Sequence, residues 1–186
     1  MIAATVAGRP VSVAEVDARE VLLRRSPQTA ALPRPGTSEG RQLRRWLTQL
    51  LVTERVIAWE AGELGVTVDA ETPTEADLLP DLVARLEIGS VAAAVLAAPL
   101  ARALYARVTA PVDVGDDAIA DYLSRNPARF ADEPAPEAVV GAMLRGAACR
   151  RAFRLWLGRR RAELVWLAPG YEHPGDPRQP DNVHRH

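Results

Sequence analysis

The stretch RQLRRWLTQLLVTERVIAWEAGELG, residues 41–65, decides the fold of this chain. Its apolar residues recur at steps of three and four, which is the spacing along one face of an α-helix. Ser38 opens the segment, and Gly65 stands where a helix commonly ends in a left-handed residue. We therefore expect one long helix over residues 39–64, with an apolar face formed by Leu43, Trp46, Leu47, Leu50, Ile57, Ala61 and Leu64.

The segment before this helix begins with a strand. Residues 2–7 are short, alternating and partly β-branched, and a turn at residues 8–10 follows them. Ser12 and Glu15 form a capping-box pattern, in which each side chain bonds the backbone amide of the other, so a helix is expected from Val13 to Arg25. The three prolines within residues 27–36 predict a loop.

The rest of the chain predicts further helices and one more strand. The expected helices cover residues 73–88, 90–108 (kinked at Pro99), 115–125 and 137–161, and the strand covers residues 163–167. Two isolated strands at opposite ends of a helical chain have each other as the obvious partner. The expected fold is mainly α, with a small two-stranded sheet joining the terminal segments of a helical domain, residues 1–168, and a tail over residues 169–186.

Composition narrows the function classes. Forty-eight per cent of the residues are hydrophobic and the net charge is −1, so neither nucleic acid nor an acidic membrane is the expected partner. The single cysteine, Cys149, excludes an internal disulfide. The N-terminus lacks the pattern of a secretory signal and no stretch is apolar enough to span a bilayer, so a cytoplasmic location is expected, with a homodimer as an open alternative.

Three stretches then carry a family likeness: ATVAGRPVSVAEVDARE (residues 4–20), RQLRRWLTQLLVTERVIAWEAGELGVTV (41–68) and VTAPVDVGDDAIADYLSRNPARF (108–130). In this order they resemble the N-terminal chaperone domain of the SurA/parvulin family of peptidyl-prolyl isomerases. The resemblance implies a fold like that helical domain. In that family a parvulin domain would follow Phe130, whereas here the short linker of residues 131–136 leads directly into the last helix.

The resemblance implies a chaperone-like binding protein without prolyl-isomerase activity. Its partner would be an unfolded or extended polypeptide, or an acyl chain, held in an apolar helical groove. The long helix and the last helix are expected to line that groove, although large aromatic residues at helical spacing are also typical of an ordinary core. The candidate groove residues are Trp46, Leu50, Trp59, Tyr105, Phe153 and Trp156.

The tail predicts a second possibility. All histidines of the chain lie in its last 14 residues, among acidic side chains, and imidazole with carboxylate suits a divalent metal or proton transfer. Repeated prolines favour a tail that folds back onto the domain, and a disordered polar tail is the competing interpretation. The candidate catalytic residues are His173, His184, His186, Asp176 and Glu172, and the three histidines are the candidate metal ligands.

The tail sequence GYEHPGDPRQPDN also looks like that of small actinobacterial proteins that accompany polyketide pathways. This second resemblance implies an accessory isomerase or cyclase acting on a free polyene or polyketide chain or on one bound to an acyl carrier protein. The sequence contains no Gly-rich phosphate loop, no nucleophile elbow and no HExxH motif, so other common catalytic classes are not supported.

Overall fold

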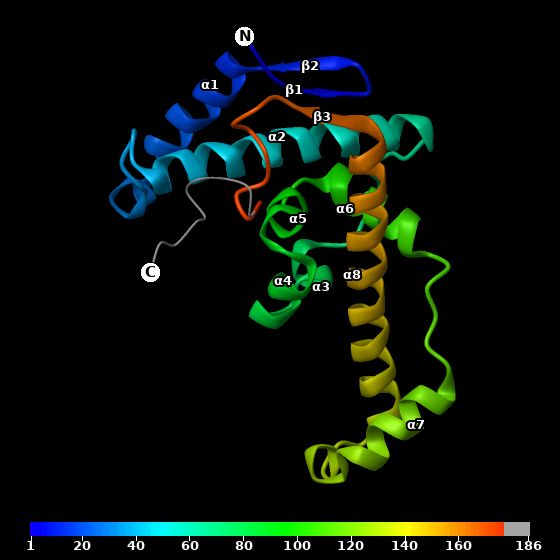
Figure 1. Cartoon of the computed structure of the whole chain (residues 1–186). Helices are drawn as coiled ribbons and strands as arrows, with labels where there is room; N and C mark the ends of the chain where they lie inside the picture. The colour runs from blue at the N-terminus through cyan, green and yellow to red at the C-terminus, as the bar shows by residue number, and fades with distance from the viewer. Residues whose placement is uncertain (177–186) are drawn as a thin grey trace. The chain divides into compact units, whose positions relative to one another are not determined.

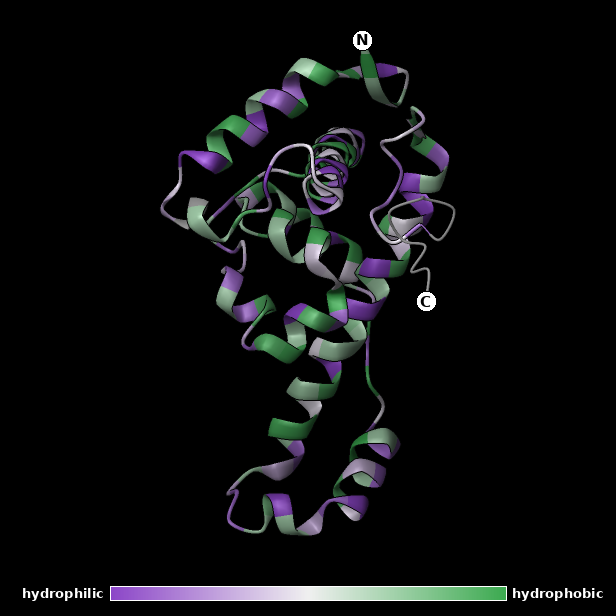
Figure 2. Ribbon diagram, turned by 60° about the vertical axis from the view of Figure 1, so that its left-hand side comes forward, coloured by the Kyte–Doolittle hydropathy of each residue, from purple (hydrophilic) through white to green (hydrophobic). Residues whose placement is uncertain are grey.

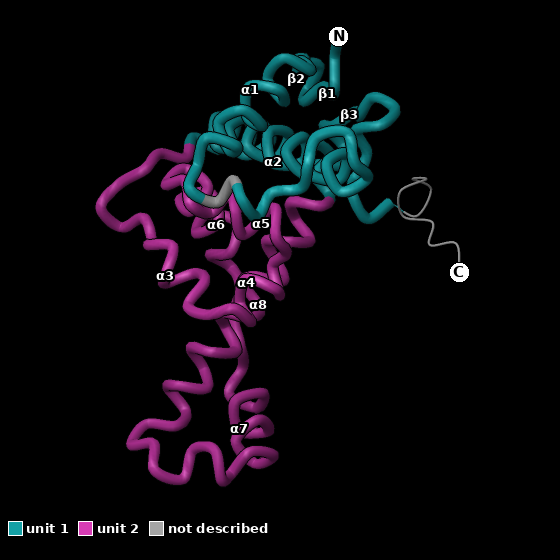
Figure 3. The backbone as a smooth tube through the Cα atoms, turned by 90° about the vertical axis from the view of Figure 1, so that its left-hand side faces the viewer, with its two compact units in different colours: residues 1–65, 159–186 teal, residues 66–158 magenta. Residues whose placement is uncertain are grey.

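The computed structural model describes residues 1–176, except for the side chains of Gln28 and Thr29. Figure 3 shows the chain divided into two compact units. Unit 1 contains residues 1–65 and the described part of residues 159–186, and unit 2 contains residues 66–158. The helical prediction is confirmed, because helices dominate the described residues and a small antiparallel sheet is the only one among them.

The sheet of unit 1 has three strands rather than the predicted two. They are β1 (Ile2–Val6), β2 (Arg9–Ser12) and β3 (Val165–Leu167), in the order β2-β1-β3 (Figure 1). The turn lies at Ala7 and Gly8, which both have positive φ, as a two-residue hairpin turn that matches the twist of the strands requires. The predicted turn at residues 8–10 was therefore placed too late. Pro10, which has no amide hydrogen, is tolerated because β2 is an edge strand.

The predicted pairing of the two chain ends is confirmed. Strand β1 pairs antiparallel with β3, and Thr5 lies opposite Trp166. The amide of Ala7 donates to the carbonyl of Leu164 at 2.8 Å, and the amide of Ala168 donates to the carbonyl of Ala3 at 2.9 Å. The last helix extends to Leu164, so β3 begins two residues later than the sequence predicts.

Two helices complete unit 1, α1 (Val13–Arg24) and α2 (Ser38–Glu63), and a short 3₁₀ helix, η1 (Pro27–Ala31), lies within the predicted loop. The capping box at Ser12 is present, and Thr37 caps α2 one residue before the predicted Ser38. Apolar side chains of β1, α1 and α2 share a buried cluster formed by Ala3, Val16 and Leu47. Gly65 follows α2 with a φ of 61°, as the stop signal predicts.

Unit 2 is formed by short helices and most of one long helix. Its elements are α3 (Glu75–Leu78), α4 (Leu82–Ile88), α5 (Ser90–Val95), α6 (Pro99–Thr109), α7 (Asp116–Arg125), η2 (Pro127–Phe130) and α8 (Pro136–Leu164), whose residues from Arg159 onward belong to unit 1.

Prolines divide two of the predicted helices. The expected helix over residues 73–88 is interrupted between α3 and α4, because Pro80 has no amide hydrogen and disfavours a helical Leu79. Asp81 then caps α4 by accepting from the amide of Ala84 at 2.8 Å. In the same way Pro99 begins α6 rather than kinking one longer helix. Residues 1–176 thus contain eight α-helices instead of the six that were predicted.

Within unit 2, α7 lies beside the start of α8 (Figure 1). Gly141 permits this approach, since a Cβ atom there would lie 3.2 Å from Cδ1 of Ile119. Figure 2 shows short hydrophobic and hydrophilic bands alternating along α8. Among residues 1–176, no helix combines the length and the apolar character that crossing a membrane requires.

Candidate functional site

An open pocket of unit 2 lies between α4 and α8. It has a volume of about 530 Å³. One stripe of α8 forms most of its lining, because residues three, four and seven positions apart share a helix face. The lining residues are Glu87, Ala147, Ala148, Arg151, Arg154 and Leu155.

Helix α4 carries three large apolar side chains in the open. Leu82 is 69% exposed, Val83 is 62% exposed and Leu86 is 70% exposed. Val83 and Glu87 are four residues apart and therefore share a side of α4, which places this apolar surface next to the pocket wall. We call the pocket together with these three side chains the α4–α8 site.

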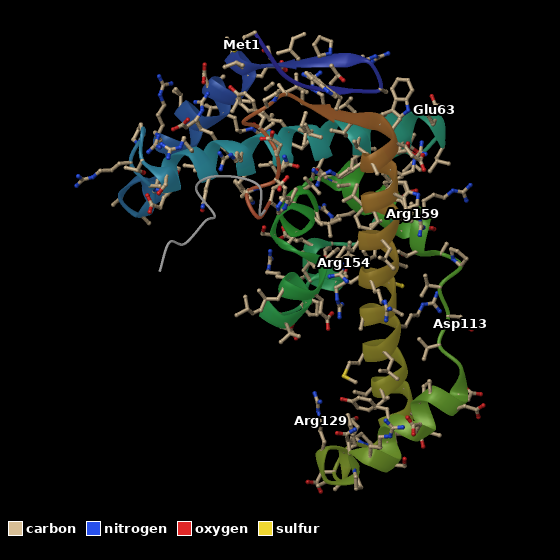
Figure 4. The ribbon with its side chains drawn as sticks, viewed as in Figure 1. Met1, Glu63, Asp113, Arg129, Arg154 and Arg159 are labelled. Atoms are coloured by element: carbon tan, nitrogen blue, oxygen red, sulfur yellow. The ribbon has the colours of Figure 1, made fainter. Side chains whose placement is uncertain are left out.

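Arginines give the α4–α8 site a positive charge. Arg150 is buried, and its Nε donates to Oε2 of Glu87 at 2.7 Å, so the one acidic group of the pocket is neutralised. Arg151 and Arg154 are exposed and make no hydrogen bond or ion pair with any residue of 1–176. Figure 4 labels Arg154 on α8. The arrangement combines an apolar floor with two guanidinium groups that no residue of 1–176 pairs.

The predicted groove residues of unit 2 lie in its core. Tyr105 and Phe153 are buried, and their ring centroids are 4.9 Å apart. The ring of Phe153 also stacks against Trp156, at 5.6 Å and an angle of 26°. Burial, followed by the neighbouring Cys149, raises the pKa of the Tyr105 hydroxyl, so Tyr105 stays protonated at neutral pH. Their role as ligand contacts stays a prediction.

The predicted groove residues of unit 1 have different surroundings. Trp46 packs against the buried cluster of α1 and α2, and Leu50 is itself buried. Trp59 lines a pocket of about 450 Å³ together with Val6, Arg9, Arg55, Ala58, Gly62 and Glu63. The Arg9 guanidinium carbon lies 5.3 Å from the centroid of the Trp59 ring. Arg55 is paired with Glu15, which leaves this second pocket less positive than the α4–α8 site.

The described part of the tail folds onto α2 within unit 1, as predicted. Tyr171 packs against the buried cluster, and its carbonyl accepts from Nε2 of Gln49 at 3.1 Å. Nδ1 of His173 accepts from the amide of Gly175 at 3.0 Å, and Glu172 accepts from the amide of Gly170 at 2.7 Å. These two side chains thus stabilise the tail's own turns.

The predicted catalytic and metal-binding role of the tail depends partly on His184 and His186, which lie outside the described residues. Asp176 donates its backbone amide to the carbonyl of His173 at 2.9 Å. Among residues 1–176, no three histidine, cysteine, aspartate or glutamate side chains lie close enough to share one metal ion. A metal site formed with the remaining histidines stays a prediction.

Sequence reasoning missed the α4–α8 site. The sequence signal that could have indicated it is the set of three large apolar residues Leu82, Val83 and Leu86. Their segment is too short for all three side chains to be buried. The sequence could not show that Arg150 is buried and paired while Arg151 is exposed and unpaired among the described residues.

Comparison with known proteins adds one partial match. A model described as a family of unknown function, DUF7158, matches residues 2–39, which comprise β1, β2, α1, η1 and the start of α2. No curated protein and no solved structure matches the chain. The matched segment lies in unit 1 and does not include the α4–α8 site.

Proposed function

We propose that this protein is a chaperone-like binding protein of the cytoplasm, which holds an extended apolar chain in its helical unit 2 and has no prolyl-isomerase activity. The observation that carries the proposal is the α4–α8 site. Three exposed apolar side chains on one short helix, next to an apolar pocket floor, are typical of a surface that binds another molecule.

The size of the site supports weak and broad binding. Full burial of a Leu or Val side chain contributes about 1.5–3 kcal/mol. Leu82, Val83 and Leu86 are already partly covered, so a bound chain gains about 3–5 kcal/mol from these three residues before the cost of ordering it is subtracted. Because the cost of ordering the chain is subtracted from this gain, these three residues alone give binding no tighter than about a millimolar, and contacts with Ala147, Ala148 and Leu155 add to it.

The family likeness agrees with this proposal. In the SurA/parvulin family the helical domain binds client chains and the isomerase chemistry belongs to the parvulin domain. Here residues 131–135 form only the short connection from η2 to α8. We therefore expect no turnover of short Xaa-Pro peptides, and turnover by the pure protein that survives further purification would contradict this part of the proposal.

The test is a pair of bulky substitutions on α8. Ala148 lines the pocket, whereas Ala142 is exposed on the same helix and does not line it. The full-length protein and the variants Ala148→Trp and Ala142→Trp would be titrated with a fluorescein-labelled apolar peptide with blocked ends and with a fluorescent polyene fatty acid.

We expect the wild type and Ala142→Trp to bind at least one of these probes with the same affinity. Ala148→Trp should weaken binding by about tenfold or more, because the indole fills the pocket. Circular dichroism would confirm that both variants fold. Equal binding by the two variants, or no binding of either probe to the wild type, would overturn the proposal.

A further inference from the structure

We infer that the ligand of the α4–α8 site is an acyl chain that ends in a free carboxylate. This inference rests on the function proposed above, and it selects one class among the extended apolar chains that the proposal allows. Two observations carry it: the positive charges of Arg151 and Arg154, which no residue of 1–176 pairs, and the α8 part of the pocket lining, whose helical backbone groups bond one another.

The charges of the site favour the binding of an anion. Glu87 is the only acidic residue of the lining, and Arg150 already pairs with it at 2.7 Å. A second nitrogen of Arg150, Nη1, donates to the carbonyl of Leu78 in α3 at 3.4 Å, so this guanidinium is bonded to both α3 and α4. Arg151 and Arg154 thus add two positive charges that no residue within 1–176 neutralises.

Two arginines three residues apart suit a carboxylate. They lie on neighbouring turns of one helix face, so both guanidinium groups reach the same region of the pocket. The planar guanidinium fork matches a carboxylate by two parallel hydrogen bonds. Such charge-assisted bonds are stronger next to an apolar floor, where water screens them less than it does in the open.

The floor of the pocket suits an acyl chain better than a peptide. Ala147, Ala148 and Leu155 offer no donor or acceptor from their side chains, and helical backbone groups in the middle of α8 bond one another. A peptide laid on this floor would leave amide groups without partners, at a cost of free energy for each one. A hydrocarbon chain has no such groups.

The dimensions fit a chain of moderate length. The stripe from Ala147 to Leu155 covers eight residue steps, which is about 12 Å along a helix axis. The exposed leucines of α4 extend the apolar surface beyond the pocket wall at Glu87. A carboxylate held by Arg151 and Arg154 therefore leaves the hydrocarbon free to follow Ala147, Ala148 and α4.

The experiment compares a fluorescent polyene fatty acid with its uncharged methyl ester, both below their aggregation concentrations. The proteins are the full-length wild type, the double variant Arg151→Gln/Arg154→Gln and the control Arg159→Gln. Arg159 is also an exposed arginine of α8 and makes no ion pair within residues 1–176, but it does not line the pocket.

We expect the wild type to bind the acid about tenfold more tightly than the ester and to lose that preference at high salt. The double variant should lose about tenfold in affinity for the acid and keep its affinity for the ester. Arg159→Gln should behave as the wild type. Equal affinity for acid and ester, or equal loss in the double variant and the control, would overturn the inference.

The outcomes separate this inference from the proposed function. If the labelled peptide binds and Ala148→Trp blocks it, while the fatty acid does not bind, the proposed function stands and the carboxylate ligand is wrong. If neither fatty acid, ester nor peptide binds, both are wrong. Ester binding that Ala148→Trp blocks, without any preference for the acid, contradicts the carboxylate ligand and leaves the proposed function standing.

Discussion

The seam between α1 and α2 and the surface between α4 and α8 use the same residue types with different results. Across the α1–α2 seam, arginines meet acids from the facing helix: Arg19 lies 2.5 Å from Glu54, and Arg44 lies 2.6 Å from Asp17 and 2.8 Å from Glu20. Across the α4–α8 surface, only Arg150 meets an acid, Glu87, among the described residues.

The apolar side chains differ in the same way. In the α1–α2 seam, Val16 and Leu47 are buried and partly buried neighbours surround them. On α4, the side chains of Leu82, Val83 and Leu86 are exposed, so no neighbouring side chains cover them in the same way. The comparison teaches that, among residues 1–176, the seam pairs its charges and buries its apolar side chains, whereas the α4–α8 surface leaves Arg151 and Arg154 unpaired and three apolar side chains exposed.

The largest expected effect separates the core of unit 2 from its open surface. Phe153 is 0% exposed and packs between the rings of Tyr105 and Trp156. Phe153→Ala leaves a cavity and should lower the free energy of unfolding by about 3–5 kcal/mol. Urea denaturation followed by circular dichroism measures the change.

Leu155 provides the matched control for that substitution. It is two residues further along α8 and 49% exposed, so Leu155→Ala should cost less than about 1 kcal/mol of stability while weakening ligand binding. A large loss of stability in Leu155→Ala would mean that the side chains of the α4–α8 surface are packed as closely as those of the α1–α2 seam.

A smaller loss is expected where the end of α8 joins α2 within unit 1. Glu60 is only 5% exposed, and Nε and Nη2 of Arg160 donate to its Oε1 at 2.9 and 2.7 Å. Arg160→Ala removes the partner of this buried carboxylate and should cost about 1–3 kcal/mol of unfolding free energy. The neighbouring exposed Arg159→Ala should change the urea midpoint little, and equal effects of the two would refute this role of the pair.

The sequence predicted the parts of the fold that depend on local pattern. It placed the long helix, the capping box at Ser12 and the pairing of the two chain ends. It missed strand β2, because Arg9 and Pro10 resemble a turn and their strand forms only by pairing with β1. It also merged α3 with α4, since the periodicity continues through Pro80 although the hydrogen bonds cannot.

The site was harder to predict because it depends on tertiary neighbours. Arg150 and Arg151 are adjacent in the sequence, yet one is buried against Glu87 and the other is exposed in a pocket. Helical spacing likewise could not show that Phe153 is buried while Trp59 lines an open pocket. Periodicity identifies a face of a helix, and only the packing of other helices decides which part of that face remains open.

A pH-dependent effect is expected at the α1–α2 seam. The backbone amide of Ser12 donates to the Glu15 carboxylate at 2.7 Å and lowers the pKa of Glu15 below its ordinary value of 4.5, and Arg55 adds to this shift. The stabilisation is therefore complete above about pH 4.5 and is lost as the pH falls through the lower pKa of the folded state.

The measurement is the thermal midpoint of the wild type and of Glu15→Gln between pH 7 and pH 3. The wild type should be more stable at pH 7, by less than about 1 kcal/mol because the side chain is partly exposed. The difference should shrink as the pH falls below 4.5. A constant difference across the range would show that the charge of Glu15 plays no part in capping α1.

The smallest expected effect compares two glycines of α8. Gly158 has open space around its missing Cβ, so Gly158→Ala should stabilise the protein by up to about 1 kcal/mol through helix propensity alone. At Gly146 a Cβ atom would lie 3.1 Å from Nη1 of Arg150, whose Nε holds Glu87 at 2.7 Å. The guanidinium has to move, and because Arg150 is buried and bonded to Glu87 of α4 and Leu78 of α3, its ion pair weakens. Gly146→Ala should therefore gain less stability than Gly158→Ala, or lose some.

Urea midpoints measured side by side check the order, and adding Glu87→Gln to each variant should reduce the difference between them. If Gly146→Ala is as stabilising as Gly158→Ala, the Arg150 side chain adjusts freely. Close packing then does not hold the Arg150–Glu87 ion pair in place, which is the only one that joins α4 to α8 among the described residues.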